Sequence, residues 1–202
     1  MLEIGPGRGA WTRCFVERKA AEIWALDALS AEHNGFWEYV GRHPNIHYAQ
    51  VEDNRCAMVP NESIDYFFSF GTFCHLSPEV IQGYLASVFA KMRPGAVGFL
   101  MIADYDKVNA LAHAAPKFSI ARALVGKRQL PTRLVWHLLS SVFKTHGIER
   151  MLPDKDDAPS PGRWYHLGTA RAIEMLRTAG FSICDPDVGV NHRDPVIHFE
   201  KP

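Results

Sequence analysis

The sequence predicts an α/β fold with a doubly wound, mostly parallel sheet, and three observations lead to this prediction. A short apolar segment at the start of the chain runs directly into a glycine-rich turn, after which apolar residues recur at helical spacing. Strand-sized apolar segments then alternate with helical ones as far as residue 103. Near the C-terminus, two strand-like segments are too close together for a helical crossover, which needs about a dozen residues, so we expect them to pair antiparallel.

The first elements follow the order strand, helix, strand, helix. Residues 1–4 form a short apolar strand that ends at the glycine turn, and a second buried strand is expected over 23–27. Apolar residues four apart place a helix within 31–40. The next two strands are expected over 45–51 and 63–69.

Capping signals bound the helix that follows. Ser77 supplies a helix cap, Pro78 stands at the first turn, and Arg93-Pro94-Gly95 ends the helix. The remaining elements are a fifth strand, a helix stopped by a glycine and two closing strands, expected over 97–103, 169–179, 181–184 and 195–199.

The chain is expected to form a single domain. Its 202 residues are enough for one substantial core and too few for two domains of ordinary size. The alternation of strands and helices stops after Asp104, where a basic stretch and an amphipathic helix near 133–145 are expected instead. We therefore expect one domain over 1–202 with a helical cap inserted over 107–163.

The composition is that of a globular protein without net charge. The 22 basic side chains cancel the 22 acidic ones, so no net field recruits nucleic acid or a membrane. No apolar run reaches the roughly 20 residues of a membrane span, and no signal peptide is visible, which indicates a cytoplasmic location. The four cysteines lack paired spacing, and Pro44 breaks any helix that would place His43 and His47 on one face. No metal is therefore expected.

The turn Gly5-Pro6-Gly7-Arg8-Gly9 predicts a nucleotide-cofactor site. Glycines let a ligand approach the backbone, and the following helix offers unpaired N–H groups and a partial positive charge. Asp27, at the end of the second strand, has a carboxylate that can accept hydrogen bonds from ribose hydroxyls. A looser pattern, with Ala10 in the last position, also fits a dinucleotide cofactor. From these residues alone, both interpretations stay open.

Residues 2–9, Leu-Glu-Ile-Gly-Pro-Gly-Arg-Gly, resemble the first motif of the class I methyltransferases that use S-adenosylmethionine. An acidic residue two positions before the glycines, here Glu3, is typical of that motif and is usually lacking in dehydrogenases. The resemblance covers nearly the whole chain except the insertion. It implies a seven-stranded sheet of order 3-2-1-4-5-7-6 in which strand 7 is antiparallel.

The resemblance also implies that S-adenosylmethionine is the cofactor. Asp27 would hold its ribose, the loop after the third strand its adenine, and the end of the fourth strand its methionine part. The cofactor-binding residues expected on this basis are Glu3, Gly5, Pro6, Gly7, Gly9, Asp27, Ala28, Asp53, Asn54, Ser69 and Phe70.

The acceptor pocket is expected at the carboxyl edge of the same sheet. His75 follows the fourth strand, Tyr105 follows the fifth, and His166 returns the chain to this edge after the insertion. These three residues are the candidate catalytic groups, because such side chains can take a proton or orient a substrate. Asp104, Asp106 and the Arg163-Trp164-Tyr165 segment are expected to line the pocket.

The expected activity is methyl transfer to a small-molecule acceptor. An oxygen acceptor is favoured, because histidines and a tyrosine converge on the pocket. The basic side chains of the insertion, among them Lys127 and Arg128, favour an anionic acceptor. Two alternatives stay open: an NAD-dependent oxidoreductase, and a methyltransferase-like protein that binds a cofactor or partner without catalysis. The oligomeric state is left open.

Met1 lies inside the first strand, whereas class I enzymes ordinarily carry one or more helices before it. We therefore expect that N-terminal helices are missing and that the chain is a fragment of a longer protein. The face beside Leu2, Ile4, Ile23 and Trp11 would then be under-covered, with an exposed apolar patch on the order of several hundred Å² that drives self-association.

Overall fold

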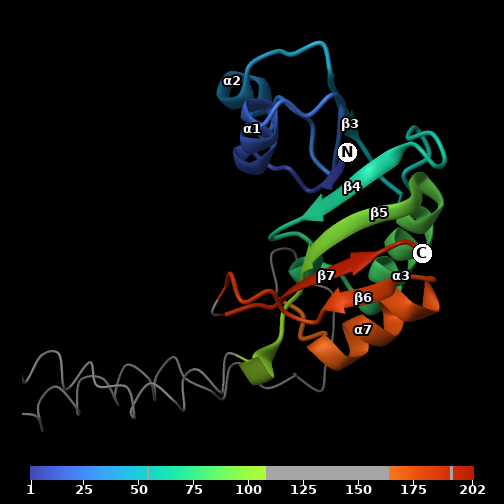
Figure 1. Cartoon of the computed structure of the whole chain (residues 1–202). Helices are drawn as coiled ribbons and strands as arrows, with labels where there is room; N and C mark the ends of the chain where they lie inside the picture. Colours follow the sequence, from blue (N-terminus) through green and yellow to red (C-terminus); the bar gives the residue numbers. More distant parts are fainter. Residues whose placement is uncertain (54, 108–163, 192) are drawn as a thin grey trace, which may run out of the picture.

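A computed structural model describes residues 1–53, 55–107, 164–191 and 193–202 (Figure 1). Apart from Lys107, the cap expected over 107–163 lies outside these described residues, and so does Asn54. In the described part, no helix is both long enough and apolar enough to cross a membrane.

Seven strands form one sheet in the order β3-β2-β1-β4-β5-β7-β6. All neighbouring strands run parallel except β7, which is antiparallel to both β5 and β6. The predicted order and the predicted direction of the last strand are both confirmed. The strands are β1 (Leu2–Ile4), β2 (Ile23–Asp27), β3 (Ile46–Gln50), β4 (Ile64–Ser69), β5 (Met92–Met101), β6 (Ser182–Asp185) and β7 (Val196–Glu200).

Helices cover both faces of the sheet. The helices in the described part are α1 (Ala10–Glu17), α2 (Phe36–Val40), the 3-10 turn η1 (Phe73–His75), α3 (Pro78–Lys91) and α7 (Thr169–Thr178). The main core joins the apolar sides of α3 and α7 to one sheet face, with Leu2, Phe67 and Phe199 among its buried residues. A smaller core packs α1 and α2 against the opposite face.

Element boundaries differ from the predictions where backbone geometry intervenes. The second helix begins only at Phe36, because Gly35 before it takes a left-handed conformation with φ 59°. Strand β5 begins at Met92, which pairs with Ile64 ahead of an irregularity in the register. Ser77 does precede α3 as predicted, but its hydroxyl makes no capping hydrogen bond.

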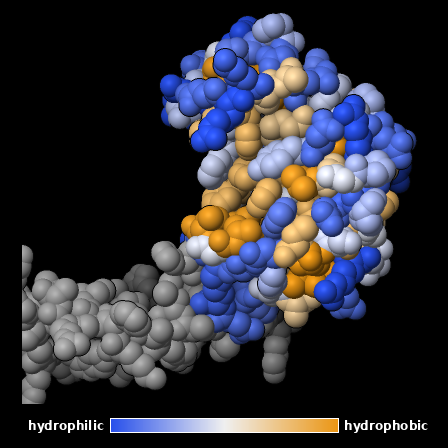
Figure 2. Space-filling view, in the orientation of Figure 1, coloured by the Kyte–Doolittle hydropathy of each residue, from blue (hydrophilic) through white to orange (hydrophobic). Residues whose placement is uncertain are grey.

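The face expected to be under-covered was placed wrongly. Leu2, Ile4 and Ile23 are at most 2% exposed, because α3 packs over the first two and α1 and α2 over the third. Trp11 is indeed exposed, at 42%. Its ring packs against both Phe68 and Phe70 of the β4 segment, which also stack on each other. Figure 2 shows a hollowed face with hydrophobic colouring between the α1–α2 end of the sheet and the β6–β7 end.

Candidate cofactor and acceptor site

The three glycines of the first turn have different roles. All have positive φ angles, 72° at Gly5, 53° at Gly7 and 93° at Gly9. A Cβ at Gly5 would come within 1.8 Å of the Thr72 hydroxyl oxygen, and one at Gly9 within 2.2 Å of Val40. A Cβ at Gly7 would meet nothing within 4 Å. Gly7 therefore faces open space, while the other two glycines allow the turn to pack against its neighbours.

Asp27 is held directly against this turn. Its Oδ2 accepts a hydrogen bond of 2.9 Å from the Gly7 N–H, and its Oδ1 accepts one of 2.9 Å from the Leu29 N–H. A carboxylate has about four acceptor positions, so each oxygen retains a lone pair for a ligand. The predicted ribose-binding acid is thus fixed in orientation beside the open space at Gly7.

Glu3 lies beneath the turn. It is 2% exposed, and Oε2 accepts a hydrogen bond of 2.6 Å from the Thr12 hydroxyl in the first turn of α1. Burial raises the pKa of Glu3 to about 7, although the Thr12 hydrogen bond acts in the opposite direction. With so little exposed surface, Glu3 supports the turn from below. Pro6 is buried as well.

The end of β4 is tied to the glycine turn by two hydroxyl groups. The Ser69 hydroxyl, which is buried, donates a hydrogen bond of 2.8 Å to the Ile4 carbonyl. The Thr72 hydroxyl donates one of 3.3 Å to the Gly5 carbonyl. Phe70 follows Ser69 and contacts Trp11, with ring centroids 5.2 Å apart. Thr72 was missed in the sequence, because a threonine in a loop carries no signal of its partner.

The predicted adenine and ribose loops are exposed. Ala28 follows Asp27 at the surface, and its carbonyl accepts a 2.9 Å hydrogen bond from Gln50. Asp53 is exposed, and its carboxylate accepts a hydrogen bond of 3.2 Å from the Arg55 N–H. Asn54 lies outside the described residues.

On the acceptor side, three rings or planar groups stack at the carboxyl edge of the sheet. His75 lies against Trp164, with ring centroids 6.1 Å apart and an interplanar angle of 23°. The Arg193 guanidinium carbon stands 3.4 Å from the Trp164 ring centroid. The Tyr165 N–H donates a hydrogen bond of 2.9 Å to the Cys74 carbonyl, which fixes the returning chain beside η1. His75 itself is exposed.

Tyr105 and His166 contact each other. The Tyr105 N–H donates a hydrogen bond of 3.0 Å to His166 Nδ1, and the Tyr105 hydroxyl donates to the Trp164 carbonyl. A neutral His166 therefore carries its proton on Nε2 and has no nitrogen left to accept another proton. Of the three candidate catalytic residues, Tyr105 and His166 thus form a pair, and His75 stacks on Trp164.

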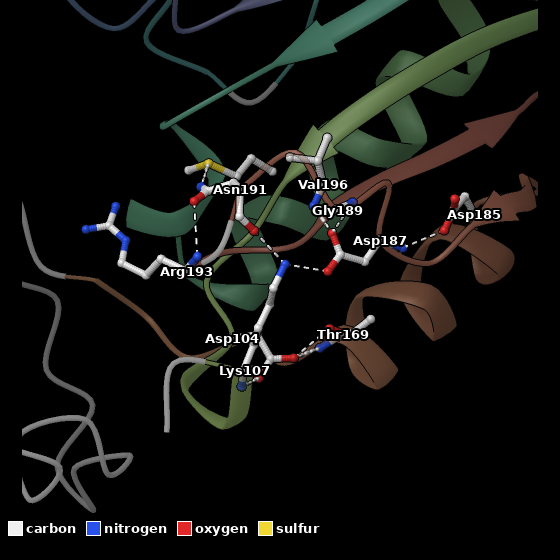
Figure 3. A network of polar contacts seen from close by, with 10 residues as sticks. Asp104, Lys107, Thr169, Asp185, Asp187, Gly189, Asn191, Arg193 and Val196 are labelled. Atoms are coloured by element: carbon white, nitrogen blue, oxygen red, sulfur yellow. Dashed lines mark hydrogen bonds and ion pairs between the residues drawn. The ribbon is translucent and has the colours of Figure 1, made fainter. Parts of the chain in front are cut away.

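Asp104 joins the end of β5 to the start of α7 (Figure 3). One oxygen accepts hydrogen bonds from the Asp106 and Lys107 N–H groups, and the other from the N–H and hydroxyl of Thr169. Burial alone would raise the pKa of Asp104, but these bonds together hold it below its usual value. Asp104 is therefore a structural link, while Asp106 is exposed. Among the described residues, no group of three or more His, Cys, Asp or Glu side chains is arranged to hold a metal ion.

Known proteins share this fold. Residues 1–95 match the family model described as a methyltransferase domain. No curated protein matches the sequence. A Mesorhizobium loti S-adenosylmethionine-dependent methyltransferase is 18% identical, with a TM-score of 0.61 over 98% of this chain and 89% of its own.

Two further solved structures extend the comparison. A Burkholderia thailandensis 1,6-didemethyltoxoflavin N1-methyltransferase, solved with that substrate and S-adenosylhomocysteine, is 16% identical, with a TM-score of 0.60 over 99% of this chain and 69% of its own. A Haloferax volcanii methyltransferase in complex with a methyltransferase activator is 12% identical, with a TM-score of 0.60 over 100% of this chain and 81% of its own.

At these identities the solved structures establish the fold, and the family match covers the part of the chain that carries the glycine turn and Asp27. Residues 1–95 therefore match the methyltransferase-domain family, and the chain has the class I, Rossmann-like fold of the S-adenosylmethionine-dependent methyltransferases.

Proposed function

We propose that this chain transfers the methyl group of S-adenosylmethionine to an oxygen atom of a small-molecule acceptor. The observation that supports this most directly is the open space at Gly7 beside the fixed carboxylate of Asp27. When bound, S-adenosylmethionine supplies a methyl group already activated by its sulfonium. The chain's own residues then have to bind the cofactor, orient the acceptor toward the methyl group and exclude water.

The cofactor would bind along the carboxyl ends of β1, β2 and β4. Gly7 leaves room for its methionine part, and Asp27 has free acceptor positions for two ribose hydroxyls. Ala28 and Asp53 would flank the ribose and adenine from the exposed loops, and Phe70 would flank the methionine end. Asn54, which lies outside the described residues, stays in the proposal as a cofactor-binding residue. The remaining predicted residues support the turn through packing and hydrogen bonds: Glu3, Gly5, Pro6, Gly9 and Ser69.

Proton removal from a hydroxyl acceptor falls to His75 in this proposal. Transfer of the methyl group from sulfur to oxygen would break a C–S bond and form a C–O bond, and the hydroxyl proton would have to leave. An exposed histidine at the edge of the sheet can accept this proton. His166 is less suited, because its Nδ1 already accepts the Tyr105 N–H. Tyr105 and His166 would shape the pocket wall with Trp164. We extend the proposal to a single domain over 1–202 in which 107–163 is an inserted cap.

Nitrogen is the second acceptor type to consider, because the Burkholderia thailandensis protein is named as an N-methyltransferase. A neutral amine needs no base before it attacks the methyl group. His75→Asn should therefore lower kcat with a hydroxyl acceptor by roughly 10²-fold or more, and leave an amine acceptor little affected. Equal effects on both acceptor types would show that His75 does not accept the hydroxyl proton.

Calorimetric titration with S-adenosylhomocysteine and, separately, with NAD tests the cofactor. We expect binding of S-adenosylhomocysteine and none of NAD. The opposite preference would support the oxidoreductase alternative and overturn the proposal.

A further inference from the structure

We propose that Arg193 binds an oxyanion, a carboxylate or a phosphate, on the methyl acceptor. This assignment rests on the proposed function, because the oxyanion is placed on the molecule that receives the methyl group. Arg193 lies in the β6–β7 loop, outside the glycine turn and outside residues 1–95 that match the family model.

The Arg193 guanidinium is held by two groups and keeps most of its donors. Nε donates a hydrogen bond of 2.8 Å to Asp194, whose side chain is 1% exposed, and the guanidinium lies over Trp164 at 3.4 Å. Within the described part of the chain, no hydrogen bond occupies its two terminal amino groups. The side chain of Arg193 is 52% exposed. It therefore presents a planar fork of N–H donors, the geometry that pairs with a carboxylate or phosphate.

The loop that carries Arg193 is anchored by a polar network (Figure 3). The Arg193 N–H donates a hydrogen bond of 3.1 Å to the Asn191 side chain, and Lys107 donates one of 2.7 Å to the Asn191 carbonyl. Lys107 also pairs with Asp187, which in turn accepts a 3.2 Å hydrogen bond from the Val196 N–H. Figure 3 shows the guanidinium pointing away from this network. The network therefore fixes the backbone of Arg193 without using its terminal amino groups.

Arg193 also lies at a position that suits an acceptor. Trp164, under the guanidinium, stacks against the His75 ring. The backbone N–H of His75 donates a hydrogen bond of 2.9 Å to the Thr72 carbonyl. Thr72 in turn contacts Gly5 of the glycine turn. A continuous chain of contacts thus leads from the cofactor turn past His75 to Arg193. The inference places the nucleophile of the acceptor near His75 and its oxyanion at Arg193.

The alternative role for Arg193 is purely structural, holding Trp164 through its stem and its bond to Asp194. Arg193→Met retains an apolar side chain over Trp164 but loses the terminal donors together with the bond to Asp194. The same change is therefore also made in an Asp194→Asn background, where no buried carboxylate loses its partner. Arg193→Lys keeps the charge and loses the planar fork. Arg177→Met is the matched control, since Arg177 is exposed on α7 and lies in no contact described above.

The probes are benzoate, phenyl phosphate and the neutral benzamide, titrated by NMR against each protein in the presence of S-adenosylhomocysteine. For wild type we expect at least one anionic probe to bind about tenfold or more tightly than benzamide, as charge-assisted hydrogen bonds would produce. The anionic probe that binds more tightly shows whether Arg193 prefers a carboxylate or a phosphate. Arg193→Met should remove this preference, Arg193→Lys should reduce it, and Arg177→Met should keep it.

Equal binding of anionic and neutral probes by wild type, or a preference unchanged in Arg193→Met, would overturn the inference. The same titrations without anion report S-adenosylhomocysteine affinity, which Arg193→Met should leave unchanged. Failure of wild type to bind S-adenosylhomocysteine would instead contradict the proposed function. The two failures are therefore distinguishable.

Discussion

The backbone N–H of Gly7 donates a hydrogen bond of 2.9 Å to Oδ2 of Asp27, which joins the glycine turn to the end of β2. The same carboxylate accepts the Leu29 N–H through its other oxygen. Two parts of the chain that a nucleoside cofactor must contact together are thus connected before any ligand binds. The first two predictions test each partner of this bond.

Asp27→Ala should weaken S-adenosylhomocysteine binding by roughly 1–3 kcal/mol, because hydrogen bonds to a charged acceptor are lost. Titration calorimetry measures the change. Asp65→Ala is the comparison, since Asp65 is an exposed acid at the start of β4 whose carboxylate pairs with Arg93. If Asp27→Ala left the affinity for S-adenosylhomocysteine unchanged, Asp27 would not bind the ribose.

Gly7→Val should abolish cofactor binding and leave the sheet folded, because the branched side chain would fill space that is open in the structure. Valine at φ 53° also strains the backbone by about 1–2 kcal/mol. Gly95→Val controls for that strain, since Gly95 has φ 77°, faces open space and lies at the start of β5. Circular dichroism should show both variants folded. Binding retained by Gly7→Val would mean that the open space is not the cofactor site.

Glu3 should make the fold less stable as the pH rises. Its pKa lies at about 7 in the folded protein against an ordinary 4.5, so between these values the folded state holds more protons than the unfolded state. Stability therefore falls as pH increases through this window, by roughly 3 kcal/mol in total, and the whole cost is present above pH 7.

Glu3→Gln removes this titration and keeps an acceptor for the Thr12 hydroxyl. Urea unfolding of both proteins at pH 5 and pH 8 measures the effect. The variant should gain stability relative to wild type at pH 8 compared with pH 5. An equal difference at the two pH values would show that Glu3 is not the buried acid described here.

Asp104→Asn should destabilise the fold by about 2–3 kcal/mol at neutral pH, because an amide cannot accept all four hydrogen bonds that the carboxylate receives. The pKa of Asp104 lies below its ordinary 3.8, so its contribution is fully present above that value and is lost as pH falls. Asp106→Asn, the exposed neighbour, should leave the free energy of unfolding nearly unchanged. Similar losses in both variants would contradict the role of Asp104 as a link between β5 and α7.

Much of the fold could be predicted because the signals were local. The glycine turn, the apolar strands and the short β6–β7 connection determine which elements form and which strand is antiparallel. The site was predictable to the extent that Gly7 and Asp27 follow their strands directly. Glu3 and Ser69 were predicted to bind the cofactor. Whether such side chains face a ligand or the interior depends on partners, Thr12 and Ile4, that the sequence does not identify.

The remainder depends on contacts between distant segments. Thr72 with Gly5, and Arg193 with Trp164, are pairs that no sequence spacing relates. The covering of Leu2 and Ile4 by α3 also follows from tertiary packing, which is why the under-covered face was misplaced. Asp104 was expected to line the pocket, but its bonds to Thr169 could only be found in three dimensions.

Methyl transfer itself is the most direct test of the account. Wild type and Gly7→Val should be incubated with S-adenosylmethionine labelled on its methyl group and a fractionated pool of small metabolites, and label should be followed into acceptor fractions. We expect transfer into at least one fraction by wild type and none by Gly7→Val. Binding of S-adenosylhomocysteine by wild type without transfer to any fraction would contradict the assignment as an enzyme and favour a protein that binds the cofactor without catalysis.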